Sequence, residues 1–220
     1  MKIKAIITGA TGMVGEGVLH ECLLHPDVEA ILVINRKPCG VIHPKLIEII
    51  QGDFTDLSAV EHHLKGYDAC FFCLGVTSIN KKEPEYTALT YTLTLTIAEK
   101  LAALNAGMTF CYVSGAGTDS TEKGKMMWAR VKGKTENDLM KLPFKKVFAF
   151  RPAFIQPTRG LKNANKLYTG ISFLYPVLRA IFPKYVSTLK EIGLAMINAA
   201  LHGYEKSILE VSDIVKLSER

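Results

Sequence analysis

The sequence lacks three features that would place the protein in a membrane or outside the cell. No run of 18 uncharged apolar residues occurs, so we expect no membrane-spanning helix. The first residues lead directly into a strand-like run, without the charged end, apolar centre and cleavage site of a secretory signal. The five cysteines are scattered and odd in number, which argues against a disulfide framework. These absences together predict a cytoplasmic protein.

The excess of positive charge is small. Lysine and arginine number 27 against 21 aspartates and glutamates, which gives a formal net charge of +6. Such a surface could attract nucleic acid or anionic lipid, and it suits a dinucleotide with several phosphates equally well. Aromatic and basic residues do not interleave as in RNA-binding modules, so nucleic acid is the least favoured partner. Cys70 and Cys73 lie three apart in a strand-like run and face opposite sides, so no metal site is predicted.

Apolar, β-rich runs alternate with helix-like segments, which is typical of a parallel sheet covered by helices on both faces. The expected strands are Ile3–Ile7, Ala30–Ile34, Leu46–Ile50, Ala69–Leu74, Thr109–Val113, Lys146–Phe150 and Ile208–Val211. The expected helices are Gly12–Leu24, Tyr86–Leu104, Gly124–Leu142 and Leu189–Leu201. The sequence therefore predicts one doubly wound α/β domain over residues 1–220, in which residues 156–220 contribute a small C-terminal lobe.

The segment Tyr86–Leu104 is ambiguous. Residues Thr90–Thr96 alternate and are rich in β-branched side chains, as in a strand. The residues after them, up to Asn105 and Gly107, have the spacing and the C-terminal stop of a helix. Because two successive parallel strands need a crossover, we expect one long helix here.

A glycine-rich turn, Thr8–Gly15, lies between the first expected strand and the first expected helix. In this context Gly9 permits the tight turn, Gly12 lets the backbone approach a pyrophosphate, and Gly15 lets the helix pack closely on the strand. The free N–H groups at the helix N-terminus and the helix dipole favour an anion there. The turn therefore predicts a bound nicotinamide dinucleotide, in preference to an ordinary glycine-rich connection.

The glycines are spaced Gly-x-x-Gly-x-x-Gly, and further short motifs follow in order up to about residue 160. These motifs are Asn35-Arg36, Gly52-Asp53-Phe54, Cys73–Thr77, Ser114–Gly117, Val131–Glu136 and Arg151-Pro152. In them the chain resembles the short-chain dehydrogenase/reductase superfamily, and most closely its atypical members related to the Tat-interacting oxidoreductase. The resemblance implies a Rossmann domain with cofactor contacts from Gly9, Thr11, Gly12, Met13, Val14, Gly15, Leu74, Gly75, Val76, Arg151, Pro152, Ala153 and Phe154.

The residues after the second expected strand bear on the choice of dinucleotide. NAD-binding folds usually place a carboxylate there for the ribose 2′-hydroxyl, whereas an arginine accommodates a 2′-phosphate. Here the strand ends in Asn35, Arg36 and Lys37, without a carboxylate. A guanidinium can bind phosphate with two hydrogen bonds, so Arg36 is the better candidate and Lys37 a helper. NADP(H) is therefore favoured over NAD(H), and the alternative is a solvated basic loop.

Asp53 and Phe54 follow the third expected strand. The resemblance places both in the cofactor site, with the Asp53 side chain on the adenine amino group. The alternative role for Asp53 is helix capping, for which Asp56 competes. The resemblance also implies that the segment from Arg151 positions the nicotinamide end of the cofactor.

The catalytic residues implied by the resemblance are incomplete. In this superfamily a Tyr-x-x-x-Lys pair on one helix face works with a serine after the fifth strand. Lys132 matches the lysine, which by resemblance also binds the cofactor through its ribose. Ser114 matches the serine, but Trp128 stands at the tyrosine position. An indole N–H is only a hydrogen-bond donor. Three alternatives follow: another proton source such as Tyr168 or a water, slow hydride transfer without an acid, or cofactor binding without catalysis.

These observations predict an NADP(H)-dependent oxidoreductase or nucleotide-sugar-epimerase-like enzyme acting on an unidentified small molecule. The alternative is a non-catalytic regulator that binds NADP(H) and a protein partner. In either case we expect the chain to be a monomer or a homodimer. By resemblance, the substrate contacts come from the apolar, basic segment between Gln156 and Tyr185. That segment could also pack as a surface helix pair, or touch a membrane surface or a partner protein.

Overall fold

A seven-stranded sheet forms the centre of the computed structural model, which describes residues 2–163 and 175–220. The strands are β1 (Ile3–Thr8), β2 (Val28–Asn35), β3 (Leu46–Ile50), β4 (Ala69–Phe72), β5 (Thr109–Val113), β6 (Lys146–Arg151) and β9 (Ile208–Glu210). Their spatial order is β3-β2-β1-β4-β5-β6-β9, and all six neighbouring pairs are parallel. The order reverses between β1 and β4, which confirms the predicted doubly wound Rossmann fold and places a crevice at the carboxyl ends of those strands.

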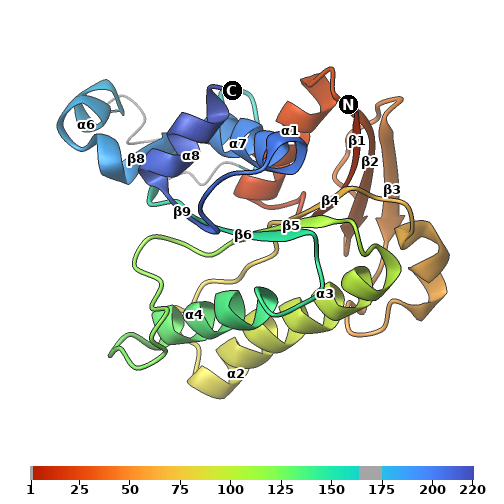
Figure 1. Cartoon of the computed structure of the whole chain (residues 1–220), viewed down its shortest axis with the longest axis horizontal. Helices are drawn as coiled ribbons and strands as arrows, with labels where there is room; N and C mark the ends of the chain where they lie inside the picture. Colours follow the sequence, from red (N-terminus) through yellow and green to blue (C-terminus); the bar gives the residue numbers. More distant parts are fainter. Residues whose placement is uncertain (1, 164–174) are drawn as a thin grey trace.

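Helices cover both faces of the sheet (Figure 1). One face carries α1 (Met13–Leu24), α7 (Leu189–His202) and α8 (Val211–Ser218), and the other carries α2 (Glu83–Thr87), α3 (Leu93–Leu104) and α4 (Met127–Leu139). The core is correspondingly split into two apolar clusters, one under each helical layer. Phe71 and Phe148 belong to the first cluster, and Phe72 and Phe110 to the second. Strands buried on both faces explain the unbroken apolar runs in the sequence.

The ambiguous segment is helical, as predicted. A π-helical turn, η2 (Ala88–Thr92), joins α2 to α3 without a break. At the start of α3 a threonine uses its hydroxyl locally: Thr94 Oγ1 donates to the carbonyl oxygen of Thr90 at 2.5 Å. Such bonds to the preceding turn let β-branched residues adopt a helix despite their preference for strands. The crossover between β4 and β5 therefore overrides the local propensity.

The C-terminal third contains elements that the sequence did not predict. A short parallel pair, β7 (Phe154–Gln156) and β8 (Val186–Thr188), forms a second sheet beside the main one. Near it lie α6 (Tyr175–Ile181) and the one-turn helix η4 (Pro183–Tyr185). A further short helix, η1 (Ser58–Leu64), lies much earlier in the chain, between β3 and β4. After β9 the chain turns at once into α8, which lies on the main sheet beside α7 (Figure 1). No helix in the described part of the chain is long and apolar enough to cross a bilayer.

Candidate cofactor site

The glycine turn depends on two glycines that the protein's own packing requires. Gly9 has φ +73°, and a Cβ there would lie 2.8 Å from the carbonyl oxygen of Cys73 at the end of β4. A Cβ on Gly15 would lie 2.1 Å from the carbonyl oxygen of Gly9. Neither overlap can be relieved by rotating a side chain, because both contacts are with backbone. Gly9 and Gly15 therefore bring β1, β4 and α1 together and need no ligand to explain them.

Gly12 is different. Its N–H donates to the carbonyl oxygen of Gly9 at 2.9 Å, and a Cβ on Gly12 would meet nothing nearer than that same oxygen at 3.4 Å. Gly12 is exposed and begins α1 without any side-chain cap. The first N–H groups of α1 thus point to solvent beside a residue with no Cβ. This is a surface that a pyrophosphate can approach closely.

A cavity of about 330 Å³ opens beside this turn, at the carboxyl ends of the central strands. Nine of the residues predicted for the site line it: Gly12, Met13, Val14, Leu74, Gly75, Val76, Ser114, Lys132 and Pro152. Four lining residues were missed: Cys73, Val113, Gly115 and Ile155. Each of the four directly adjoins a predicted site residue in the sequence. Their position next to those residues is the one signal that could have identified them.

A second hollow, of about 380 Å³, is lined by Thr11, Arg36 and Lys37. Arg36 and Lys37 are exposed, and neither has a hydrogen-bond or ion-pair partner among the described residues. The loop that carries them is fixed by Glu48 of β3, whose Oε1 accepts from Asn35 Nδ2 at 2.9 Å and from the Cys39 N–H at 2.8 Å. A carboxylate therefore shapes this loop from the neighbouring strand, while the two cations remain available to an anion.

Asp53 and Phe54 lie in different environments. Asp53 is exposed, and its Oδ1 accepts from the Thr55 N–H at 2.8 Å and from the Thr55 hydroxyl at 2.6 Å. These hydrogen bonds lower the pKa of the Asp53 carboxyl. Asp56 Oδ1 accepts from the Ser58 N–H at 2.9 Å, but the N-cap of the turn that begins at Ser58 is Leu57, which has no side-chain cap. The Phe54 ring is buried among the apolar side chains of the core cluster under α3. Only the backbone of Phe54 can therefore reach a cofactor.

Lys132 and Ser114 lie together at the wall of the cavity. The Lys132 ammonium donates to the main-chain carbonyl oxygen of Ser114. Burial of the amine lowers the pKa of Lys132 to about 8, although the carboxylate of Glu136 acts in the opposite direction. The Ser114 hydroxyl donates to the Phe150 carbonyl oxygen at 3.1 Å, so its hydrogen is directed to β6. Of the two side chains, only that of Lys132 has donors left after these hydrogen bonds, because an ammonium has three N–H groups.

Arg151 does not line the cavity. Its guanidinium makes two hydrogen bonds to Glu136, whose side chain is fully buried, and one to Ser120 Oγ at 2.6 Å. A third carboxylate contact joins it to Glu210 at 3.3 Å. The motif Arg151-Pro152 was expected to supply cofactor contacts from both residues, but only Pro152 reaches the cavity. The buried acid Glu136 on α4 and the exposed Glu210 at the end of β9 draw the arginine away, which local sequence does not reveal.

The remaining predicted residues of this segment lie beside the cavity without lining it. Ala153 is half-buried, and Phe154 begins β7 and has interactions of its own within the fold. Ile155, which follows them, is the residue that faces the cavity. Strand alternation explains the difference, because neighbouring residues of β7 point to opposite sides.

Trp128 is the second residue of α4, one turn before Lys132. Its indole packs on the loop after β5: a Cβ on Gly117 would lie 3.5 Å from Cη2 of Trp128. Trp128 is not among the residues that line the cavity. The Tyr-x-x-x-Lys position is therefore occupied by a packing residue.

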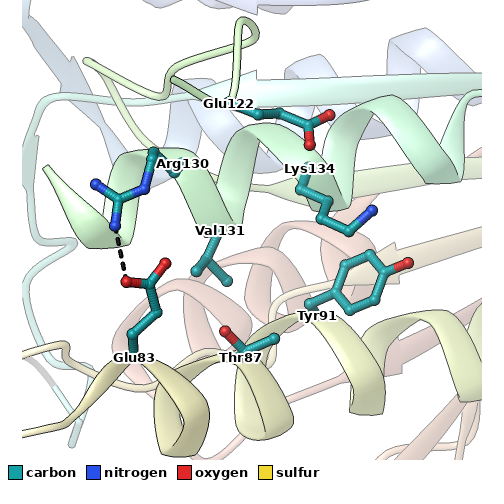
Figure 2. A pocket seen from close by; sticks show the side chains of 7 residues that line it. All are labelled: Glu83, Thr87, Tyr91, Glu122, Arg130, Val131 and Lys134. Carbon is teal, nitrogen blue, oxygen red and sulfur yellow. Dashed lines mark hydrogen bonds and ion pairs between the residues drawn. The ribbon is translucent and has the colours of Figure 1, made fainter. Parts of the chain in front are cut away.

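A smaller cleft on the other side of α4 shows how this helix is held. Figure 2 shows α2 and η2 facing α4 across the cleft, with the ion pair between Arg130 and Glu83 closing one end at 2.8 Å. At the other end, Asp138 accepts from the Tyr91 hydroxyl at 2.9 Å and pairs with Lys134 at 2.8 Å. Arg130 and Lys134 are thus paired with carboxylates, and Glu122 accepts from the Asn137 amide at 2.7 Å. The contacts from Glu83 and Tyr91 fasten α4 to α2 and η2 and so fix the position of Lys132.

Comparison with known families agrees with this geometry. The family model described as NAD(P)H-binding matches residues 9–140, which include the glycine turn, the Arg36 loop and α4. The chain belongs to this NAD(P)H-binding family. The match confirms the resemblance to short-chain dehydrogenases/reductases and the expectation of a nicotinamide dinucleotide, while the preference between NAD(H) and NADP(H) is not decided by it.

Curated relatives of similar length share about a quarter of their residues with this chain. "Protein FMP52, mitochondrial" from Meyerozyma guilliermondii is 24% identical over 216 residues, covering 95% of this chain and 90% of the relative. A protein of the same name from Emericella nidulans is 26% identical over 207 residues, covering 89% and 86%. The cytoplasmic location predicted from the sequence is wrong by this comparison. The scattered free cysteines on which it depended require only a compartment that keeps thiols reduced.

Solved structures with the same fold include enzymes that act on nucleotide sugars. The UDP-N-acetylglucosamine 4-epimerase of Methanobrevibacter ruminantium M1 superimposes with a TM-score of 0.67 at 16% identity, covering 95% of this chain and 76% of the epimerase. The Bordetella bronchiseptica enzyme WbmG, solved with NAD, gives 0.68 at 15% identity, covering 99% and 77%. At these identities the likeness extends to the fold alone.

Proposed function

We propose that this protein is an NADP(H)-dependent oxidoreductase that interconverts a carbonyl and an alcohol on a small molecule. The observation that carries the proposal is the pair of unpartnered cations, Arg36 and Lys37, at the end of β2, next to a helix N-terminus without a cap. A 2′-phosphate needs such cations, whereas the 2′-hydroxyl of NAD(H) is usually held by a carboxylate. The carboxylate of Glu48 is bonded to the loop itself, through Asn35 and Cys39.

The proposed arrangement of the dinucleotide follows the two hollows. Its pyrophosphate lies on Gly12 and the first turn of α1, with Met13 and Val14 beside it. The 2′-phosphate lies between Thr11 and the Arg36 loop, and Asp53 reaches the adenine amino group with the oxygen that Thr55 leaves free. The nicotinamide end lies further along the cavity.

The nicotinamide end of the proposed site has walls of different chemistry. Leu74–Val76 and Pro152 offer mainly backbone and apolar surface, and Ile155 closes the side toward β7. When bound, NADPH supplies a hydride for a carbonyl carbon. The chain's own part is to hold the nicotinamide and the carbonyl in place and exclude water, with Ser114 and Lys132 as the polar groups nearest the reaction.

The substrate wall is proposed to come from the C-terminal lobe. The β7–β8 pair continues from the cavity residue Ile155 toward α6, which matches the expected place of substrate contacts. Residues 164–174, including Tyr168, lie outside the described part of the chain. We keep the proposal of one domain over residues 1–220, because β9, α7 and α8 complete the main sheet and its helical layer.

A second candidate function is an NADP(H)-binding regulator without catalysis. Trp128 favours it, because the position of the usual proton donor is filled by an indole that packs on Gly117. In that case the dinucleotide would order the cavity and change the affinity for a protein partner.

The experiment that separates these functions is transfer of deuterium from stereospecifically deuterated NADPH to a panel of aldehydes, ketones and nucleotide sugars. We expect the label on the carbinol carbon of at least one product, measured by mass spectrometry. Tight NADPH binding without transfer to any member of the panel would contradict the oxidoreductase and support the regulator.

A further inference from the structure

Only two ionisable side chains line the cavity in the described part of the chain, Cys73 and Lys132. Burial raises the pKa of the Cys73 thiol to about 12, so this thiol keeps its proton throughout the neutral range. Burial lowers the pKa of Lys132 to about 8, so this amine both holds and releases a proton near neutral pH. General acids work best when their pKa lies close to the working pH.

The geometry around Lys132 leaves donors available. An ammonium has three N–H donors, and the Ser114 carbonyl oxygen is the one hydrogen-bond partner found for it among the described residues. Ser114 belongs to the end of β5, and Pro152 and Gly75 line the same cavity from the ends of β6 and β4. The remaining N–H groups of Lys132 are therefore within a space that a carbonyl oxygen can enter.

Charged groups behind Lys132 influence its proton affinity. Glu136 lies one turn further along α4 and is fully buried, and its carboxylate is held by the Arg151 guanidinium from β6. Glu210, the last residue of β9, is the second carboxylate on Arg151, and its side chain is half-exposed. From β5, Tyr112 faces the same region, but burial raises its pKa above the usual range and it stays neutral. Glu136 with Arg151 thus forms a fixed charged pair that supports the ammonium.

The other expected donors are not suitably placed. The Ser114 hydroxyl is directed to Phe150, and the Trp128 indole packs on Gly117 outside the cavity lining. An indole N–H does not release its proton in this pH range. Lys132 is therefore the one group of the described lining that combines access with a transferable proton.

We propose that Lys132 itself is the proton donor in carbonyl reduction, in place of the missing tyrosine, with Glu136 and Arg151 as positioning residues. This inference rests on the proposed oxidoreductase function. The carbonyl carbon gains a C–H bond from the hydride of NADPH, the C=O π electrons move to oxygen, and that oxygen takes a proton from the Lys132 ammonium. The carbonyl is reduced to an alcohol, the nicotinamide is oxidised, and Lys132 becomes a neutral amine that regains its proton from water.

The first test is Lys132→Arg in the full chain. Arginine keeps the positive charge and the N–H donors, but its pKa is far higher than that of lysine, which prevents proton release. We expect kcat to fall on the order of 10²- to 10⁴-fold, the usual contribution of a general acid, while the Kd for NADPH changes little. The matched control is Lys141→Arg, an exposed lysine just beyond α4, which should leave kcat unchanged.

The second test measures the amine directly and needs no turnover. The full chain is labelled with ¹³C-lysine and titrated by NMR, and the Lys132→Arg spectrum identifies the Lys132 signal. We expect that signal to titrate near pH 8, apart from the other lysines, and the kcat of the wild type to fall with the same midpoint as pH rises. A wild-type spectrum in which all lysine signals titrate together would overturn the proposal, and this result needs no assignment from the arginine variant.

The positioning role of the buried pair has its own readout. Glu136→Gln removes a carboxylate that raises the Lys132 pKa, so the alkaline fall in kcat should move to lower pH. Glu122→Gln, whose carboxylate bonds to Asn137 instead, should leave the midpoint unchanged. A purely structural role for Glu136 would reduce stability without moving this midpoint.

The outcomes separate this inference from the proposed function. Absence of turnover in the wild type overturns both. Turnover that survives Lys132→Arg, or that is lost in Tyr168→Phe instead, overturns the assignment of Lys132 and leaves the oxidoreductase function standing.

Discussion

The two ends of the cofactor cavity are built in different ways. At the phosphate end, Gly9, Gly12 and Gly15 are neighbours in sequence, and Arg36 follows the next strand directly. At the reacting end, Ser114 directly follows β5 and Lys132 belongs to α4. Arg151 of β6 contacts the same helix through its ion pair with Glu136. The proposed cofactor binding therefore depends on a local motif, whereas the proposed proton transfer depends on contacts between distant segments. The two properties should be separable by substitution.

The largest expected effect lies at the phosphate end and concerns the fold. Gly15→Ala places a Cβ 2.1 Å from the Gly9 carbonyl oxygen, which only a shift of α1 can relieve. We expect a loss of at least about 3 kcal/mol, the upper end for overpacking, or a fall in Tm of roughly 6–12 °C. Thermal unfolding measured by circular dichroism tests this.

Gly12→Ala is the matched control for that substitution. Its Cβ meets only one atom, at 3.4 Å, so Tm should stay close to that of the wild type. NADPH affinity should fall at least about tenfold, or about 1.4 kcal/mol, because the methyl group occupies the space of the pyrophosphate. Equal losses of Tm in the two variants would show that the two glycines do not differ as proposed.

The next effect is on the choice of cofactor. Arg36→Ala should raise the Kd for NADPH by roughly 10- to 100-fold, as expected for charged hydrogen bonds worth about 1.5–3 kcal/mol. The Kd for NADH should change far less, because NADH has no 2′-phosphate for Arg36 to bind. Calorimetric titration of both cofactors provides the measurement. Equal weakening for both would contradict the assigned contact.

The smallest effect concerns the reacting end. Trp128→Tyr introduces a phenol with a pKa of about 10, which stays protonated at pH 9, where most of Lys132 is neutral. The ratio of kcat at pH 9 to kcat at pH 7 should therefore rise by up to roughly tenfold, because pH 9 lies about one unit above the pKa of the Lys132 amine. Trp128→Phe, which lacks the hydroxyl, should show no such rise. If both variants behave alike, position 128 does not reach the reacting atoms.

Much of the fold follows from periodicity. The predicted bounds of β3 and β5 match the structure, and the helical assignment of Tyr86–Leu104 holds because a crossover is needed there. The π-helical turn at Ala88–Thr92 and the pairing of β7 with β8 were not predicted. Both depend on tertiary contacts of short segments, for which local sequence carries little signal. The expected last strand includes Val211, which instead begins α8.

The site was predictable where a motif is local. Gly12, Leu74 and Lys132 line the cavity as the motifs indicated. Arg151 and Phe54 do not present their side chains to it, because a buried acid holds the first and the core takes the ring of the second. The opposite case is Glu48, a charged residue within the apolar strand β3 that fixes the Arg36 loop from a distance.

The most direct test of the account is the affinity of the wild-type chain for NADPH and NADH, measured side by side by calorimetry at one ionic strength. The unpaired cations at the end of β2 predict that NADPH binds at least about tenfold tighter, a difference of about 1.4 kcal/mol. Equal affinities, or tighter binding of NADH, would contradict the NADP(H) assignment.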